Sequence, residues 1–103
     1  MKKLAEVDVQ IVKMRESSGN EQFFVRQVRN DNQSGRLSMR GVLMYSCWET
    51  KHLDKAKCLS RAWFDASFVA GFVGLGSMDE VILIGLDDDE IKILKSSRSM
   101  LHV

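Results

Sequence analysis

The sequence predicts an α+β fold in which an antiparallel sheet of four to five strands packs against one long amphipathic helix, in the order β-β-β-α-β-β. Residues 49–73 form the only long stretch with helical periodicity. The segments before it alternate between apolar and polar residues, as half-buried strands do. After it, residues 81–86 form a continuous apolar run of strand length and composition.

Length and composition predict one folded domain that spans residues 1–103. A hydrophobic content of 45% is enough for a single core of modest depth, and the absence of proline argues against linker-like disorder. No apolar run approaches the roughly 20 residues of a membrane-spanning helix. The first residues pass directly into charged, alternating sequence, so we expect a cytoplasmic protein without membrane contact.

Three strands are predicted in the first half of the chain. Residues 7–14 alternate in hydrophobicity, and residues 23–28 are aromatic and β-branched. Gly19 and Asn20 between them reach positive φ at little cost, which indicates an antiparallel hairpin. Residues 37–47 show the clearest alternation in the chain, and we expect them to form a half-buried third strand.

The helix in residues 49–73 is predicted to bury one face and expose a polar stripe. Its start is ambiguous, because Ser46 with Glu49 fits a capping box and Thr50 also fits as N-cap. Gly71, Gly74 and Gly76 indicate its end. The predicted apolar face comprises Leu53, Ala56, Leu59, Trp63, Ala66 and Ala70. The predicted polar stripe comprises Lys51, Asp54, Lys55, Cys58, Arg61 and Asp65.

The C-terminal quarter allows two interpretations. The apolar run of residues 81–86 is typical of a strand covered on both faces, so we expect it at the centre of the sheet. Residues 87–90 then form either a hairpin loop before a strand over 91–95, or the first turn of a helix with Asp87 as N-cap and Glu90 at N3. The alternation of Ile91 with Ile93 favours the strand.

The sequence contains no recognised catalytic signature. Cys47, His52 and Cys58 form a small cluster, but a structural zinc site requires four ligands at closer spacing. Two cysteines are too few for a disulfide-stapled secreted scaffold, so we expect reduced thiols. His52 and His102 do not lie beside a nucleophile in a known local motif. We therefore expect no enzymatic activity, no cofactor and no metal.

Charge is unevenly distributed although the net charge is only +1. Residues 1–78 carry twelve basic and eight acidic side chains. Residues 79–90 contain no base and the following acids: Asp79, Glu80, Asp87, Asp88, Asp89 and Glu90. This acidic segment lacks the spaced oxygens of a calcium loop, so we expect a solvated turn or helix cap, which also offers an epitope to a basic partner.

An apolar segment at the helix end predicts a protein interface. Residues 66–76 are apolar almost all round, and a small domain has little surface with which to cover them. The candidate contact residues are Phe68, Val69, Phe72 and Val73. We therefore expect a small protein-binding domain of the accessory, inhibitor or immunity type, and a second copy of the chain is one partner that we consider.

Nucleic-acid binding is the alternative. In the pattern of residues 7–65, three strands followed by one helix, the chain resembles the plant AP2-type and integrase arm-type DNA-binding domains. The resemblance implies that the free face of the sheet would enter the major groove. The basic residues that would then contact DNA are Arg26, Arg29, Arg36 and Arg40. The near-neutral net charge argues against this alternative, because affinity grows with the number of phosphates neutralised.

Overall fold

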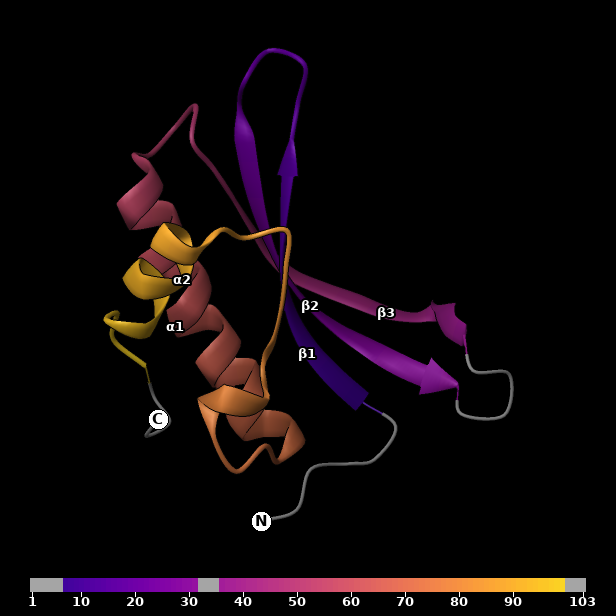
Figure 1. The fold of residues 1–103 in the computed structure, drawn as a ribbon. Helices are drawn as coiled ribbons and strands as arrows, with labels where there is room; N and C mark the ends of the chain where they lie inside the picture. The colour runs from indigo at the N-terminus through magenta and orange to yellow at the C-terminus, as the bar shows by residue number, and fades with distance from the viewer. Residues whose placement is uncertain (1–6, 32–35, 100–103) are drawn as a thin grey trace.

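The computed structural model describes residues 7–31 and 36–99, without the side chains of residues 30–31 and 36–40. It shows an α+β fold in which the helices lie on one side of a strongly twisted four-stranded sheet of order β3-β2-β1-β4 (Figure 1). The strands are β1 (Val7–Arg15), β2 (Glu21–Asp31), β3 (Arg36–Glu49) and β4 (Ile82–Ile84). The helices are α1 (Lys55–Val73), the 3-10 turn η1 (Met78–Glu80) and α2 (Asp88–Lys95).

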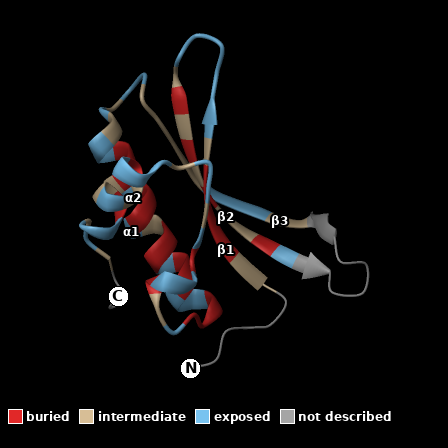
Figure 2. Ribbon diagram, viewed as in Figure 1, coloured by how far each residue is buried: buried red, intermediate tan, exposed pale blue. Residues whose placement is uncertain are grey.

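The first three strands form the predicted antiparallel meander. Gly19, at φ 93°, makes the tight turn between β1 and β2, and the register places Ile11 opposite Val25. Because successive side chains alternate between faces, Val9, Ile11 and Val25 lie on the same side of the sheet, where all three are fully buried. This side faces α1, as the red segments in Figure 2 show.

Helix α1 begins later than the sequence indicates. Its N-cap is Asp54, whose carboxylate accepts a hydrogen bond from the Lys57 amide, whereas Ser46 and Glu49 still pair with β2. The predicted cap at Ser46 or Thr50 is therefore wrong, because strand pairing outcompetes the local capping signal. Gly74 ends the helix in the left-handed region at φ 86°, within the predicted group of glycines.

The buried face of α1 contains most of the predicted apolar residues. Leu59, Trp63, Ala66 and Ala70 are buried against the sheet. Ala56 is instead exposed, and Cys58, which we assigned to the polar stripe, is fully buried. The buried face is therefore rotated slightly toward Cys58 at the start of the helix.

Residues 81–86 do not form a central strand. β4 has three residues, pairs in parallel with β1, and lies at the edge of the sheet. Ile82 and Ile84 are partly exposed, while Val81 and Met78 contribute to the core from just before the strand. The sheet is therefore mixed rather than purely antiparallel, because the chain crosses over through α1 before it returns beside β1.

Residues 88–95 form a helix, so the favoured hairpin with a strand over 91–95 is wrong. Asp87 accepts a hydrogen bond from the Glu90 amide at 2.8 Å, and Glu90 Oε1 accepts one from the Asp87 amide at 2.9 Å. This reciprocal capping box satisfies two donors at the helix start, which a hairpin loop would leave to water. Among the described residues, no helix is long and apolar enough to cross a membrane.

An ion-pair network with two buried carboxylates and a partly exposed Lys55 connects α2 and α1 to the sheet. Lys13 Nζ of β1 lies 3.0 Å from Glu21 Oε2 of β2 and 2.9 Å from Glu90 Oε2 of α2. Lys55 Nζ of α1 contacts the same two carboxylates, at 2.9 Å and 3.1 Å. Glu90 is only 2% exposed. Each carboxylate is therefore shared by two lysines, an arrangement that offsets the cost of burying charge.

This network makes stability depend on pH. Burial opposes ionisation of Glu21, but hydrogen bonds from Lys55, Arg15 and Lys13 prevail and lower its pKa to about 2. Because the folded pKa lies below the ordinary value of 4.5, the stabilisation is present above pH 4.5 and lost as pH falls toward 2. We expect Glu21→Gln to cost roughly 3 kcal/mol at pH 7 and much less near pH 2. Urea unfolding of both proteins across this range measures the difference, and a constant gap would contradict the assignment.

The helix-on-sheet core predicts a large effect at Trp63. This side chain is 1% exposed between α1 and the sheet, so Trp63→Ala should cost about 3 to 5 kcal/mol through lost burial and the cavity left behind. Trp48 is only partly buried, and Trp48→Ala should cost less. Denaturant unfolding checks both values, and near-native stability of the Trp63 variant would contradict the packing described above.

Candidate functional site

Helix α1 carries three exposed phenylalanines on the side away from the sheet. Phe64, Phe68 and Phe72 follow one another at intervals of four residues and so lie on one side of the helix. Their exposed fractions are 40%, 62% and 82%. A single exposed apolar side chain is ordinary, but a row of large aromatic rings in solvent indicates a contact surface. We name this row the phenylalanine stripe.

The edge strand β3 places Tyr45 in a groove with Phe64 and Phe68 of the stripe. Leu43, Met44 and Tyr45 are all exposed, and a register shift between Val25 and Arg26 leaves Tyr45 without a partner residue in β2. The Tyr45 hydroxyl donates a hydrogen bond to Gln27 Oε1 at 2.7 Å, which fixes the ring. An open groove of about 310 Å³ lies between β3 and α1, and its lining consists of Tyr45, Phe64, Asp65, Phe68 and Val69.

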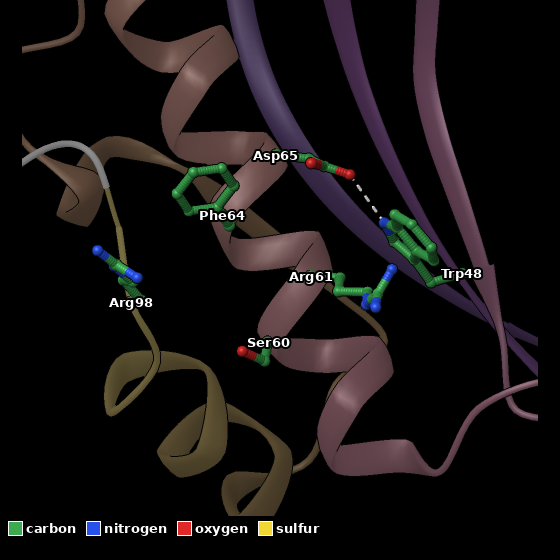
Figure 3. Close-up of a pocket in the computed structure, with 6 residues that line it drawn as sticks. All are labelled: Trp48, Ser60, Arg61, Phe64, Asp65 and Arg98. Atoms are coloured by element: carbon green, nitrogen blue, oxygen red, sulfur yellow. Dashed lines mark hydrogen bonds between the residues drawn. The ribbon is translucent and has the colours of Figure 1, made fainter.

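A second open groove of about 440 Å³ adjoins the first across Phe64 and Asp65 (Figure 3). At one side Trp48 Nε1 donates to Asp65 Oδ2 at 2.8 Å, and the Arg61 guanidinium lies 5.0 Å from the centroid of the Trp48 ring. A cation over an indole face is held electrostatically, so Arg61 and Trp48 are mutually positioned. The residues that line this second groove are Trp48, Ser60, Arg61, Phe64, Asp65 and Arg98.

The two grooves and the stripe together form one surface. We name it the aromatic surface and define it by these residues: Tyr45, Trp48, Arg61, Phe64, Asp65, Phe68 and Phe72. Its charge changes along α1, because Lys57 and Arg61 are exposed in the first half and no charged residue follows Asp65 within the helix. Beyond the C-terminal end, Asp79 and Glu80 of η1 are exposed. The N-terminal half of the phenylalanine-bearing side of α1 is therefore basic, and its C-terminal half is uncharged.

The structure separates the four residues predicted as a protein interface into two pairs. Phe68 and Phe72 are exposed, whereas Val69 and Val73 are buried in the core, at 2% and 6% exposure. Phe64 and Tyr45 were not predicted from the sequence. The spacing of four between Phe64, Phe68 and Phe72 is a signal that could have identified Phe64, but Tyr45 depends on a register shift that alternation does not reveal.

The described part of the structure does not bring the four arginines proposed for nucleic-acid binding together on one face. Arg26 stands in register with Gln10 and donates a hydrogen bond to its Oε1 at 2.9 Å. Arg29, three residues further along β2, stands in register with Val7 and therefore belongs to the opposite face. The side chains of Arg36 and Arg40 are not among those that the structure describes.

The cysteines and histidines are dispersed. Cys47 and Cys58 are both free, and burial raises the pKa of each thiol, so both are mainly protonated at neutral pH. Cys47 is only partly buried, and His52 is exposed. Within residues 7–31 and 36–99 no group of three or more metal-ligating side chains comes together, and His102 lies outside this region. What the described residues do assemble is an aromatic surface beside two open grooves.

Comparison with protein-family models, with curated proteins and with solved structures finds no match to this chain. No residue role is therefore transferred from another protein. The function is therefore inferred from the geometry of the aromatic surface.

Neighbouring residues at the end of α1 give a matched test of this geometry. Phe72 is 82% exposed and Val73 is 6% exposed, so an aspartate should be tolerated at the first and not at the second. We expect Phe72→Asp to change the stability of the monomer by about 0.5 kcal/mol or less. Val73→Asp should cost several-fold more. Tryptophan-fluorescence unfolding at low protein concentration measures both, and equal losses would show that the stripe is not exposed.

Proposed function

We propose that this protein is a non-enzymatic protein-binding domain, of accessory or inhibitor type, whose contact site is the aromatic surface. The observation that carries the proposal is the phenylalanine stripe, with three large rings exposed in a row beside two open grooves. Protein interfaces are enriched in aromatic residues and arginine, and their strongest contacts fill desolvated pockets. The free cysteines Cys47 and Cys58 fit a reducing compartment, so we place the domain in the cytoplasm.

The size of the surface supports a specific contact. If each phenylalanine offers about 200 Å², the exposed fractions of the three rings amount to roughly 370 Å² of apolar area. That is close to half of the roughly 800 Å² that each partner contributes to a standard interface. Tyr45, Trp48 and Arg61 border the stripe and extend it with groups that combine apolar area and hydrogen-bonding capacity.

Removing these rings from water on binding lowers the free energy of the complex. Covering 370 Å² of apolar surface is worth on the order of 9 kcal/mol before the entropy cost of association is subtracted. The rings sit on a helix that the core holds in place through Trp63, so little ordering is required on binding. We rank protein binding ahead of nucleic-acid binding because Arg26 and Arg29 stand on opposite faces of the sheet.

A photo-cross-linking experiment in living cells tests the proposal. We expect a benzoylphenylalanine residue in place of Phe72 to form a discrete protein adduct, because its ketone would lie inside the interface. The same residue in place of Lys92, which is exposed on α2 away from the aromatic surface, is the matched control. The Phe72 adduct should disappear when Phe68→Asp is added.

Two results would contradict the proposal. One is the absence of any protein adduct at Phe72. The other is an adduct that forms equally at Lys92 or that persists in the presence of Phe68→Asp, because neither would depend on the aromatic surface.

A further inference from the structure

We propose that the partner binds the aromatic surface through a segment with two halves, one rich in carboxylates and one with large apolar side chains. This inference rests on the proposed function and specifies the chemistry of the partner. It follows from the different character of the two grooves that adjoin at Phe64 and Asp65. We name the groove of about 440 Å³ the basic groove and the groove of about 310 Å³ the apolar groove.

The basic groove brings together cations from two elements. Arg61 belongs to α1 and Arg98 to the segment that follows α2, and Figure 3 shows them on opposite sides of Phe64. Lys57 lies one turn before Arg61 on the same side of α1 and is also exposed. None of these three cations forms an ion pair within the described part of the chain, whereas Lys55 of the same helix contacts two carboxylates. The three charges are therefore available to an acidic ligand.

The basic groove supplies little negative charge of its own. Among the described residues that line it, Asp65 is the only acid, and its Oδ2 accepts a hydrogen bond from Trp48 Nε1 at 2.8 Å. Arg61 lies over the Trp48 ring, so the indole holds the guanidinium in place. A guanidinium held in this way loses less conformational freedom when its N–H groups bind a carboxylate. A carboxylate is therefore the group that fits the basic groove best.

The apolar groove fits a different group. Its lining consists of Tyr45, Phe64, Asp65, Phe68 and Val69. Phe72 continues the stripe beyond it, and α1 contains no charged residue between Asp65 and its last residue, Val73. This uncharged stretch runs for about 12 Å from Phe64 to Phe72, at roughly 1.5 Å per residue. Large apolar side chains of a partner fit it, because burying a charge against these rings would be costly.

This division disfavours ligands of uniform character. A DNA strand carries a phosphate for about every 3.4 Å of duplex, so phosphates would lie over Phe68 and Phe72, where α1 supplies no cation. A wholly acidic peptide would meet the same cost. A wholly apolar peptide would cover Arg61 and Arg98 without giving them a counter-charge. A protein segment with both halves is the ligand that satisfies both grooves.

Selection of random peptides displayed on phage, with the full chain immobilised, tests the inference. The side of α1 from Lys57 to Phe72 is about 22 Å long, so peptides of about twelve residues can span it in an extended form. We expect the enriched peptides to combine a cluster of aspartates or glutamates with large apolar residues. Enriched peptides without acidic residues, or no enrichment at all, would overturn the inference.

Charge reversal tests whether the acidic half lies in the basic groove. Fluorescence anisotropy with the most enriched peptide, labelled with fluorescein, measures the affinity. Arg61→Glu combined with Arg98→Glu should weaken binding by about 30-fold, because two attractive contacts become repulsive. Arg98→Glu alone leaves the contact of Arg61 with Trp48 intact and should weaken binding by about 5-fold. Circular dichroism verifies that both variants are folded.

The matched control is Lys92→Glu combined with Lys95→Glu. It makes the same change in net charge at two exposed residues of α2 that do not line the basic groove, so affinity should change by less than about 2-fold. Equal losses in the arginine and lysine variants would overturn the inference. A fluorescein-labelled oligothymidylate in the same assay tests nucleic acid. If it binds more tightly than the peptide and loses affinity in the arginine variants, the inference is wrong and the ligand is a nucleic acid.

The proposed function and this inference fail differently. Enriched peptides that are purely apolar and that lose binding with Phe68→Asp would leave the proposed function standing and overturn the acidic partner. An adduct at Phe72 in cells without any enriched peptide would have the same meaning. If there is neither an adduct nor an enriched peptide, both are wrong.

Discussion

Two buried carboxylates and the lysines that contact them connect the helices of this fold to its sheet. Lys13 from β1, Glu21 from β2, Lys55 from α1 and Glu90 from α2 meet with alternating sign, and each carboxylate contacts both lysines. Removing either lysine leaves two desolvated carboxylates with one neighbour fewer, which is more costly than never burying them. The network therefore sets where α1 and α2 sit relative to the sheet. Together with the core packing of Trp63 and Leu59, it orients α1 so that the opposite side, with its phenylalanines, faces solvent.

The parts of the fold that periodicity specifies were predictable from the sequence. The meander of three strands, the long helix and the burial of Trp63 follow from alternation and helical spacing, which act over many residues. The errors occur where two local signals are of similar strength. Ile91 and Ile93 alternate as in a strand, but the capping box of Asp87 with Glu90 stabilises a helix there. Residues 81–86 are apolar enough for a central strand, yet only three of them find a neighbour in β1.

The candidate site was predictable only in part, for a geometric reason. Consecutive residues on a helix point about 100° apart, so an apolar segment always divides between core and solvent. Phe68 and Phe72 lie on the solvent side, and Val69 and Val73 on the core side, because Trp63 and Leu59 fix the rotation of α1 against the sheet. Tyr45 joins the surface through a register shift in β3, a tertiary feature without a sequence signature. Glu90 likewise belongs to an acidic run that appears solvated until two lysines from distant segments reach it.

The parallel pairing of β1 with β4 has a consequence for biosynthesis. Ile11 stands in register with Leu83, so one edge of β1 is completed only by residues that are synthesised much later. Closing so long a loop is entropically costly and slow compared with forming the β1–β2 hairpin. Until then, β1 has an open edge, and Lys13 lacks one of its two carboxylates. Open edges recruit strands from other chains. The nascent protein is therefore most prone to aggregate in the interval before β4 and α2 are synthesised, and chaperone protection is most useful in that interval.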